Sequence, residues 1–441
     1  MENRNSISPL DGRYFNDVKD ITEIFSEEAL NKKRVYIEIE YLIAFCETIK
    51  IKIPKQALKK IYINFSDRDA KRIKQIEKTT QHDIGAVIEF VKEKTNKDAR
   101  RFVHFGLTSE DVNNLAYGLM LKEATNVYLN ALKTTILQLA EYASKHKHDV
   151  MLSRTHGEPA TPTTAGKECA NYAVRLTTQY KKLKQIKIQG KLTGATGNFN
   201  ALCTIYPEVN WITFSKNFVQ HIDLTPTLFS TQILFTDSYA ELFDTMKRIN
   251  SILIDLNKNI WLYFLLGYLS LKTSKKSMGS STMPHKVNPI FFENSEGNAE
   301  IAENLFEFFS RKLLKSRLQR DLTDSTVKRN LGVAFGHSLL SVKSLKKGLE
   351  KIVIDKEKIG KDLEAHQEIL SELVQLSLRK QGKIEGYKDI KEKTRGKKTV
   401  KEALLKNIPE KNRKIIISQY LSGKAEELVD TAIKTVKKEL I

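Results

Sequence analysis

Residues 243–260, FDTMKRINSILIDLNKNI, decide the fold class of this chain. Their apolar side chains recur every three or four positions, and this period places them along one face of an α-helix. The stripe consists of Phe243, Met246, Ile249, Leu253, Leu256 and Ile260. A second stretch with a similar period contains Leu331, Leu339, Val342, Leu345, Leu349 and Ile352. Both stretches predict long amphipathic helices with one buried face.

The distribution of proline favours long helices over most of the chain. None of the 9 prolines falls within residues 55–158 or 290–408. An interior proline costs a helix about 3 kcal/mol, so proline-free intervals of this length are typical of long uninterrupted helices. Strand-like alternation is rare and short, and we find no solenoid repeat or low-complexity linker. We therefore predict an all-α protein whose long helices form a bundle.

The positions of the loops predict how the bundle is divided. A loop-like stretch at 103–114 separates a basic helical N-terminal region from the long helices. A segment rich in lysine at 380–398 lies inside a helical C-terminal piece. We predict three domains, which are an N-terminal helical domain at 1–107, a central bundle at 108–350 and a C-terminal helical domain at 351–441.

The composition is that of a folded, water-soluble protein, with 41% hydrophobic and 29% charged residues among 441. The longest apolar run, Ile260–Leu271, is too short to cross a bilayer, and we predict a buried helix segment there. The N-terminal residues show no secretory signal. The cysteines Cys46, Cys169 and Cys203 are widely spaced. This pattern predicts neither a disulfide framework nor a zinc site, and favours the cytoplasm.

The net charge of +20 is the most unusual bulk property. Such a charge is compatible with nucleic-acid binding or with an enzyme for anionic substrates. The lysines are spread along the whole chain, and the sequence has no RGG tract, RNP-like motif or zinc-finger spacing. We therefore expect neither a nucleic-acid nor a membrane partner. A basic nucleic-acid-binding module is kept as an alternative, and it predicts salt-sensitive binding of DNA or RNA.

Polar loops between the predicted helices carry the residues that could perform chemistry. They are SPLDGRY (8–14), TTQHD (79–83), HFGLTSEDVNN (104–114), SRTHGEPATP (153–162), GSSTMPHKVNP (279–289) and RLQRDLTDSTVKRN (317–330). Each is weak alone, and a Thr-Ser pair before Glu-Asp is also an ordinary helix N-cap. No Walker, Rossmann or metal-ligating spacing occurs. Together their arginines, histidines, hydroxyls and amides suit a substrate with several negative charges, and acid–base chemistry without metal or cofactor.

Residues 279–289 resemble the signature loop GSSxMPxKxNP of the fumarase/aspartase superfamily, whose members release fumarate from a substituted succinate. The other loops resemble the bacterial type of the adenylosuccinate lyase family, and the resemblance extends from residue 8 to residue 397. Argininosuccinate lyase or fumarase would share the signature loop, but the DGRY start and the QRDLTDSTVKRN stretch distinguish this chain from them. The resemblance implies three helical domains, a homotetramer with a twenty-helix core, and active sites built from three chains.

The implied reaction is non-hydrolytic cleavage of a C–N bond in purine biosynthesis. Adenylosuccinate would give AMP and fumarate, and succinylaminoimidazole carboxamide ribotide would give its amide and fumarate. The resemblance makes Ser280 the base, working as an alkoxide stabilised by Lys286 and loop N–H groups. Lys286 and Asn288 would also hold the dianionic carbanion. The rival bases are other groups of the same loop, Ser281, Thr282 and His285.

The resemblance also implies a general acid on a different loop. His156 would protonate the departing nitrogen, and Glu293 would pair with this histidine and orient it. Glu158 stands where relatives mostly have glutamine, and a carboxylate there would tend to raise the pKa of the histidine. Gln81 replaces an asparagine of close relatives. His104 would lie near the site in a more structural role.

The substrate-binding residues are likewise implied by the resemblance. Arg13 and Tyr14 match phosphate and ribose contacts, and Thr108 and Ser109 match carboxylate contacts. The full set is Arg13, Tyr14, Gln81, His82, Asp83, Thr108, Ser109, Gln232, Ser281, Lys286, Val287, Asn288, Asn294, Arg320, Ser325, Thr326, Val327, Lys328 and Arg329. A catalytically inactive relative is a further alternative, although the catalytic positions of the family are occupied. No metal and no cofactor are expected.

Overall fold

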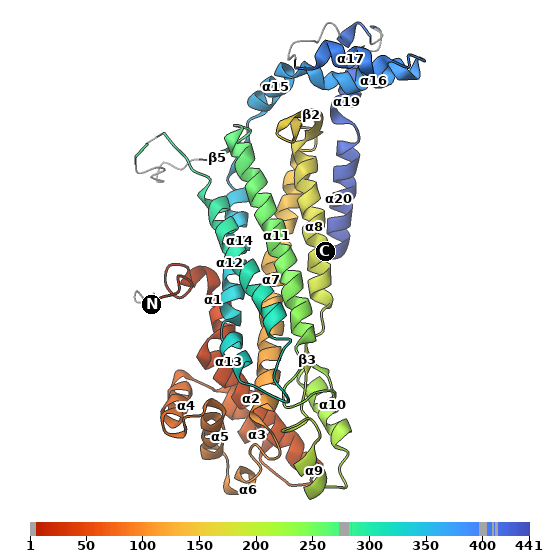
Figure 1. Cartoon of the computed structure of the whole chain (residues 1–441). Helices are drawn as coiled ribbons and strands as arrows, with labels where there is room; N and C mark the ends of the chain where they lie inside the picture. Colours follow the sequence, from red (N-terminus) through yellow and green to blue (C-terminus); the bar gives the residue numbers. More distant parts are fainter. Residues whose placement is uncertain (1–5, 273–281, 284, 397–403, 408–409, 411–412) are drawn as a thin grey trace. The chain divides into compact units, whose positions relative to one another are not determined.

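The structure is a computed structural model, and it describes residues 6–272, 282–283, 285–396, 404–407, 410 and 413–441 (Figure 1). Helices dominate these residues, and their strands form three small two-stranded sheets. The predicted all-α class is therefore confirmed. Within the described ranges, no helix combines the length and the hydropathy that a membrane crossing requires.

The elements follow one another in the order that Figure 1 colours from red to blue. The helices are α1 (Phe15–Phe25), α2 (Glu27–Thr48), α3 (Lys55–Ile63), α4 (Asp67–Thr80), α5 (Asp83–Lys94), α6 (Lys97–Arg100), α7 (Ser109–Lys145), α8 (Ala165–Gln185), α9 (Asn200–Ile205), α10 (Trp211–His221), α11 (Asp237–Leu265), α12 (Ile290–Lys312), α13 (Thr323–Lys328), α14 (Leu331–Leu349), α15 (Lys356–Ala365), the 3₁₀ helix η1 (Gln367–Leu370), α16 (Ser371–Lys380), α17 (Gly386–Thr394), α19 (Arg413–Ser422) and α20 (Ala425–Leu440). The strands are β1 (Val150–Thr155), β2 (Glu158–Thr164), β3 (Gln189–Gly190), β4 (Thr225–Pro226), β5 (Leu269–Leu271) and β6 (Ile352–Ile354).

The chain divides into two compact units, each assembled from segments that are distant in the sequence. Unit 1 contains residues 1–130, 182–250 and 298–340, and unit 2 contains residues 131–181, 251–297 and 341–441. The boundaries fall inside α7, α8, α11, α12 and α14. The division into three domains at 107 and 350 stays a prediction.

The apolar stripe at 243–260 is buried, as its period predicts. All six of its side chains are buried in α11, and the most exposed of them, Ile260, is only 6% exposed. In unit 1, Phe243 stacks on Phe306 of α12 with ring centroids 5.9 Å apart. Phe306 in turn meets Phe335 of α14 edge-on at 5.4 Å. The stripe is therefore the face by which α11 contacts its neighbours in the core.

The second predicted helix ends earlier than its apolar pattern indicates. α14 stops at Leu349, and Ile352 belongs to β6, which pairs antiparallel with β5. Ile352 and Ile354 still bury their side chains, so the hydrophobic pattern continues past the end of the helix. Periodicity alone cannot separate a last helical turn from a short buried strand.

The apolar run Ile260–Leu271 is not one buried helix segment, which corrects the prediction. α11 ends at Leu265, and Gly267 adopts φ 73° in the left-handed conformation. The amide groups of Gly267 and the residue after it donate back into the last turn of α11, forming a Schellman motif. Trp261, Leu262 and Leu265 are 40%, 47% and 68% exposed. The helix therefore carries large apolar side chains on its outer face.

Unit 2 contains the hairpin β1–β2, which joins α7 to α8 (Figure 1). Leu152 of β1 is buried in a cluster with Leu370, Val374 and Leu404. In the same unit, Val429 of α20 packs against alanines of α7 and α8. The hairpin thus rests on the C-terminal part of the chain, which fixes where its turn lies within the unit.

Candidate active site

The first group of predicted site residues lies at the beginning of α7 in unit 1. Helix α7 starts at Ser109, and the N–H of Thr108 donates to Oδ2 of Asp111 at 3.0 Å. This contact is a helix cap, which confirms the N-cap pattern in the sequence. The free N–H groups of a first helical turn attract anions. Thr108 and Ser109 therefore stand where a substrate carboxylate would be favoured.

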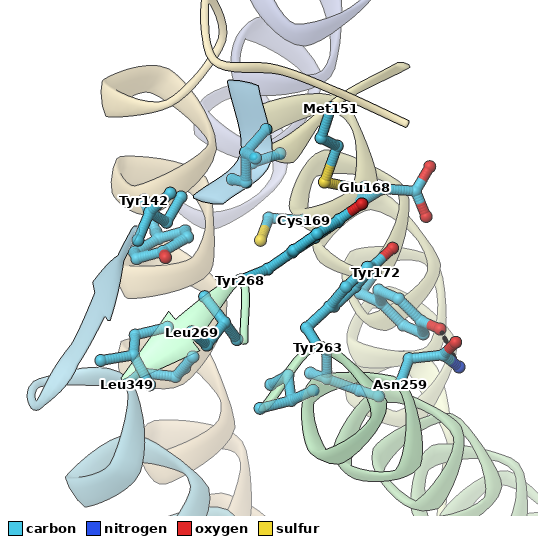
Figure 2. A pocket seen from close by; sticks show the side chains of 16 residues that line it. Tyr142, Met151, Glu168, Cys169, Tyr172, Asn259, Tyr263, Tyr268, Leu269 and Leu349 are labelled. Atoms are coloured by element: carbon cyan, nitrogen blue, oxygen red, sulfur yellow. Dashed lines mark hydrogen bonds between the residues drawn. The ribbon is translucent and has the colours of Figure 1, made fainter. Parts of the chain in front are cut away.

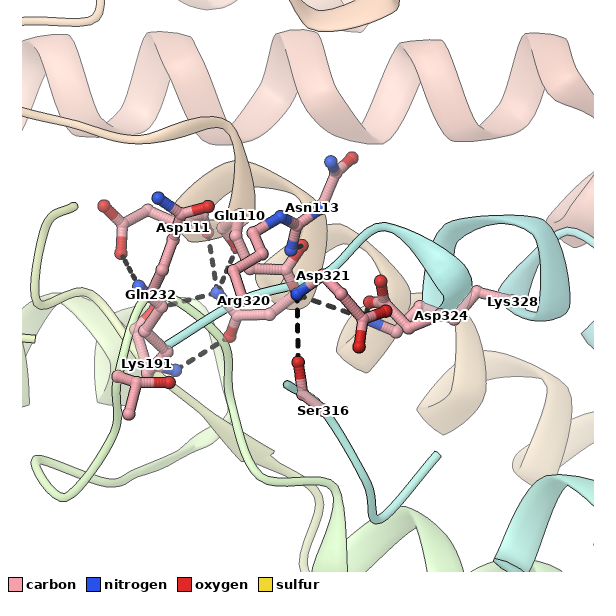
Figure 3. Close-up of polar contacts among 12 residues, drawn as sticks. Glu110, Asp111, Asn113, Lys191, Gln232, Ser316, Arg320, Asp321, Asp324 and Lys328 are labelled. Atoms are coloured by element: carbon pink, nitrogen blue, oxygen red, sulfur yellow. Dashed lines mark hydrogen bonds and ion pairs between the residues drawn. The ribbon is translucent and has the colours of Figure 1, made fainter. Parts of the chain in front are cut away.

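Glu110, the next residue, organises a cluster of buried charges (Figure 3). Its carboxylate accepts from Nη1 of Arg320 at 3.1 Å and from Nζ of Lys328 at 3.0 Å. Lys328 also pairs with Asp324 at 2.7 Å. Burial opposes the charge on Lys328, but the two carboxylates outweigh it and raise the pKa of the ammonium. Glu110 therefore places two of the predicted substrate-binding cations, Arg320 and Lys328.

Asp111 holds a different partner, the fully buried Lys191. Their charged atoms are 2.9 Å apart, and neither side chain is exposed. The Lys191 ammonium also donates to the carbonyl of Gly194, and Oδ1 of Asp111 accepts from the N–H of Thr193. Ala195 follows Gly194 in the chain, and its carbonyl accepts from the side-chain amide of Gln232 at 3.1 Å. The predicted substrate glutamine is thus attached to a loop that Asp111 and Lys191 fix in place.

The His-Asp pair of the TTQHD loop forms the start of α5. Nδ1 of His82 accepts from the N–H of Gly85 at 2.9 Å, so the histidine caps the helix and its Nε2 carries the proton. Oδ2 of Asp83 accepts from Arg34 at 2.8 Å and from Arg329 at 3.1 Å. Burial opposes ionisation of Asp83, but the arginines outweigh it and keep its pKa below the usual value. The pair brings Arg329, at the end of α13, to the His82 loop.

The other predicted residues of unit 1 lie at the end of α4, at the start of α1 and in α13. Gln81 ends α4 at φ 53°, a left-handed conformation that asparagine adopts more readily than glutamine. The Arg13 guanidinium lies over the ring of Tyr14, 5.7 Å from its centroid, at the start of α1. In α13 the side chain of Val327 is buried. The side chains of Ser325 and Thr326 are half-buried and exposed, respectively.

His104 has a buried carboxylate as its partner, which supports a structural role for it. Its Nδ1 lies 2.6 Å from Oε1 of Glu38, a side chain with no exposed surface. Burial would lower the pKa of His104, but the ion pair and hydrogen bond with Glu38 outweigh it and raise the pKa above its ordinary value. His104 is therefore held against Glu38 just before the loop that leads into α7.

In unit 2, the predicted general acid occupies the tip of the β1–β2 hairpin. Thr155 and Glu158 pair across the hairpin, and His156 and Gly157 form the two-residue turn between them. Their φ angles are 54° and 82°, and positive values at both places are typical of a type I′ turn. His156 is exposed, and it makes no hydrogen bond to any described residue.

The signature loop and the start of α12 hold the other predicted residues of unit 2. Ser280 and Ser281 lie outside the described residues. The side chains of Lys286 and Val287 are exposed and that of Asn288 is half-buried. Glu293 accepts from Nε1 of Trp261 at 3.3 Å, and Asn294 accepts from a serine of α14 at 2.7 Å. Among the described residues of one chain, Glu293 makes no hydrogen bond to His156.

The sequence did not single out several residues that hold these groups in place. Glu110 and Asp111 stood inside a recognised motif, but their pattern indicated only a helix cap. Arg34, Lys191 and Glu38 carried no signal, because nothing local distinguishes them from the other charged residues of the chain. Their charged partners Asp83, Asp111 and His104 are 49 to 80 residues away along the chain, so only tertiary structure pairs them.

A cavity of about 40 Å³ lies elsewhere in unit 2 (Figure 2). Its lining is apolar and aromatic and includes Tyr142, Tyr172, Tyr263 and Tyr268. None of the predicted site residues lines it. Pockets for small molecules are usually about 300 to 1,000 Å³ in volume, so this cavity is too small for a nucleotide.

Comparisons with known proteins agree with the motifs and with the fold. A family model described as "Lyase" matches residues 12–301, and one described as "Adenylosuccinate lyase C-terminal" matches residues 316–422. Among solved structures, a 3-carboxy-cis,cis-muconate lactonizing enzyme from Pseudomonas putida superposes with a TM-score of 0.79 at 19% identity, covering 96% of this chain and 98% of the other. A fumarate lyase from Mesorhizobium sp. BNC1 gives 0.75 at 16% identity, covering 94% and 97%. These structures support the helical multi-domain fold.

Relatives of higher identity carry one name. The adenylosuccinate lyase of Dictyostelium discoideum is 47% identical over 425 residues, which are 91% of each chain. That of Escherichia coli strain K12 is 43% identical over 412 residues, or 90% of each chain. That of Legionella pneumophila strain Corby is 42% identical, covering 96% of this chain and 98% of its own. The chain therefore belongs to the adenylosuccinate lyase family, within the fumarase/aspartase superfamily.

Proposed function

We propose that this chain is a carbon–nitrogen lyase that eliminates fumarate from adenylosuccinate to give AMP. The same site would release fumarate from succinylaminoimidazole carboxamide ribotide in purine biosynthesis. The observation that carries the proposal is the identity of 41–47% to relatives named adenylosuccinate lyase, over 90% or more of both chains. The arginine- and hydroxyl-rich loops support it, because both substrates carry two carboxylates and a phosphate.

The groups of unit 1 bind the anionic substrate. Arginine recognises carboxylates and phosphates through paired N–H donors. Arg320 and Arg329 are each placed by a carboxylate that accepts from one guanidinium nitrogen, which leaves the other donors for the substrate. Thr108 and Ser109 add hydroxyl and backbone donors at the first turn of α7. His82 offers its Nε2–H from the start of α5, while Arg13 and Tyr14 take the phosphate and ribose.

Ser280 removes the proton from the carbon next to a carboxylate. The electron pair left behind converts that carboxylate to a dianion, which forms only if cations and donors are already in place. Lys286 and Asn288, six and eight residues further along the same loop, supply this stabilisation. Lys286 also lowers the energy of the serine alkoxide, without which a hydroxyl is a weak base.

His156 gives a proton to the nitrogen as the C–N bond breaks. Its exposure at a hairpin tip suits this role, because a general acid must be able to reach the substrate. Glu293 orients the imidazole. Since the structure records no contact of these two residues in one chain, we propose that they meet across a subunit contact.

We propose a homotetramer whose active sites draw loops from more than one chain. The outer face of α11 supports it, because Trp261, Leu262 and Leu265 expose large apolar side chains in one helical turn and a half. The three cysteines are unpaired, which fits the reducing cytoplasm. The mechanism uses side chains alone and requires neither cofactor nor metal, and no nucleic-acid or membrane partner takes part.

The deciding experiment is a fumarate assay with purified protein in EDTA, using both purine substrates, argininosuccinate and malate. We expect fumarate from the two purine substrates only. Ser280→Ala and His156→Ala should each lower kcat by orders of magnitude and stay tetrameric, whereas Thr282→Ala and His285→Ala should retain far more activity. Fumarate from neither purine substrate would overturn the proposal. Full activity in Ser280→Ala would overturn the assignment of the base.

A further inference from the structure

The hairpin that carries His156 is attached to the C-terminal segment by a charged pair that the proposed mechanism does not use. Arg154 lies two residues before His156, in β1. Its Nη2 donates to Oδ2 of Asp362, in α15, at 2.8 Å. The two side chains are 25% and 18% exposed, so the pair is shielded from most of the solvent. Arg154 is thus directed into unit 2 and away from the hairpin tip.

Asp362 is the centre of a larger set of contacts. The hydroxyl of Tyr268 donates to the same Oδ2 that accepts from Arg154. His366 lies near the other carboxylate oxygen of Asp362. Its Nε2 is 3.6 Å from Oδ1 of Asp362, and its Nδ1 is 2.8 Å from Oε1 of Glu368. Burial opposes ionisation of Asp362, but the hydrogen bonds from Tyr268 and Arg154 outweigh it and keep its pKa below the usual value. Asp362 is therefore an anion that ties β1 and the residue before β5 to α15.

The other strand of the hairpin has an anchor of its own. Thr161 of β2 donates to Glu372 of α16 at 2.7 Å, and the hydroxyl of Tyr420 donates to the same carboxylate oxygen at 3.0 Å. Thr161 lies four residues after Gly157 of the turn, whereas Arg154 lies two residues before His156. The Arg154 contact is therefore the nearer restraint on the turn.

The turn needs such a restraint. His156 has φ 54°, a conformation that costs a residue with a side chain about 1 kcal/mol or more, and its ring has no hydrogen-bond partner among the described residues. A misplacement of about 1 Å in a catalytic group can reduce a rate about a hundredfold. The direction of the imidazole thus depends on how firmly the base of the turn is held.

We propose that Arg154 and Asp362, with Tyr268, are positioning residues for His156. Their ion pair fixes the β1–β2 turn on α15, so that the C-terminal segment of the chain sets the placement of the general acid. The inference rests on the proposed function, since it assigns the proton transfer to His156.

The first test separates placement of the acid from binding of the substrate. Asp362→Asn should lower kcat for adenylosuccinate by about tenfold to a hundredfold and change KM by less than about threefold. Tyr268→Phe, which keeps the ring and removes one hydrogen bond, should give a smaller loss in kcat. The matched control is Glu357→Gln on the same helix. Its pair with Lys361 is 77% and 69% exposed, so kcat should stay within about twofold of the wild type.

The second test asks whether Asp362 acts through His156. In a His156→Ala background, adding Asp362→Asn should slow the reaction by less than about twofold, because the group being positioned is already gone. An equal loss in both backgrounds, or an unchanged kcat in Asp362→Asn alone, would show that the pair has no positioning role.

A third measurement does not depend on activity. Hydrogen exchange of residues 150–164 should be faster in Asp362→Asn and in Tyr268→Phe than in the wild type and in Glu357→Gln. Unchanged exchange in both variants would overturn the inference even if the wild type released no fumarate. An inactive wild type with faster exchange in the variants would instead contradict the proposed function and leave the anchor intact.

Discussion

At the scale of single residues, the beginning of α7 shows how neighbouring acids divide their contacts. Glu110 and Asp111 follow one another, yet Glu110 faces Arg320 and Lys328 while Asp111 faces Lys191. Successive residues of a helix point about 100° apart, which lets one turn serve two clusters. Each acid compensates a buried cation, so each has a larger effect on stability than a surface charge.

Replacing Glu110 should therefore weaken both the fold and the binding of substrate. Glu110→Gln removes one of the two carboxylates that pair with Lys328, whose side chain is only 4% exposed. We expect the free energy of unfolding to fall by about 3 kcal/mol and KM to rise, because Arg320 loses its anchor. Urea unfolding at a fixed protein concentration and steady-state kinetics measure the two effects. Glu89→Gln, which breaks the exposed pair with Lys92, is the control and should cost less than about 1 kcal/mol.

The Glu38–His104 pair predicts a dependence of stability on pH. The pKa of His104 is raised in the folded protein, so its proton stabilises the fold at pH below the ordinary value of 6.5. That contribution is lost as the pH rises through the raised pKa. As the pH rises from about 6.5 through the raised pKa, the wild type should lose stability relative to Glu38→Gln, in which the histidine lacks its hydrogen-bonded carboxylate. Parallel pH dependence in the two proteins, measured by urea unfolding, would rule out the pair as its source.

At the scale of elements, the β1–β2 hairpin depends on backbone conformation at its turn. Gly157 has φ 82°, and an added Cβ would meet no atom within 4 Å, so any cost of Gly157→Ala comes from the backbone. We expect a loss of about 1 kcal/mol and a lower kcat, because the turn directs His156. Gly360→Ala, also with open space but in the middle of α15, should stabilise by about 0.5 to 1 kcal/mol. Thermal unfolding distinguishes the two, and equal effects would show that the turn is not strained.

At the scale of the whole molecule, the exposed face of α11 predicts that the isolated chain is incomplete. Leu262→Glu places a charge among the exposed Trp261 and Leu265, so it should dissociate the assembly and abolish activity together. Sedimentation velocity and the fumarate assay test this on one sample. Ile384→Glu is the control, because Ile384 is 89% exposed in the C-terminal segment and lies outside the long helices. A tetramer that survives Leu262→Glu would exclude this face from the contact.

The same evidence shows why the fold class could be predicted from the sequence. The stripe from Phe243 to Ile260 and the proline-free intervals act locally, through a period of 3.6 residues and through the cost of an interior proline. The errors also have a local cause. Ile352 and the run to Leu271 follow helix ends where a Schellman turn or a short strand replaces the helix without interrupting the apolar pattern.

The sequence by itself determined the helical class, the family and the polar loops, because periodicity and motifs depend on neighbours along the chain. Only the tertiary structure decided which charges hold those loops. Glu110 pairs with Lys328 across 218 residues, and Arg154 pairs with Asp362 across 208. With 73 basic and 53 acidic side chains, the sequence allows far too many pairings to choose among. Folding selects these pairs because burial penalises any charge that it leaves without a partner.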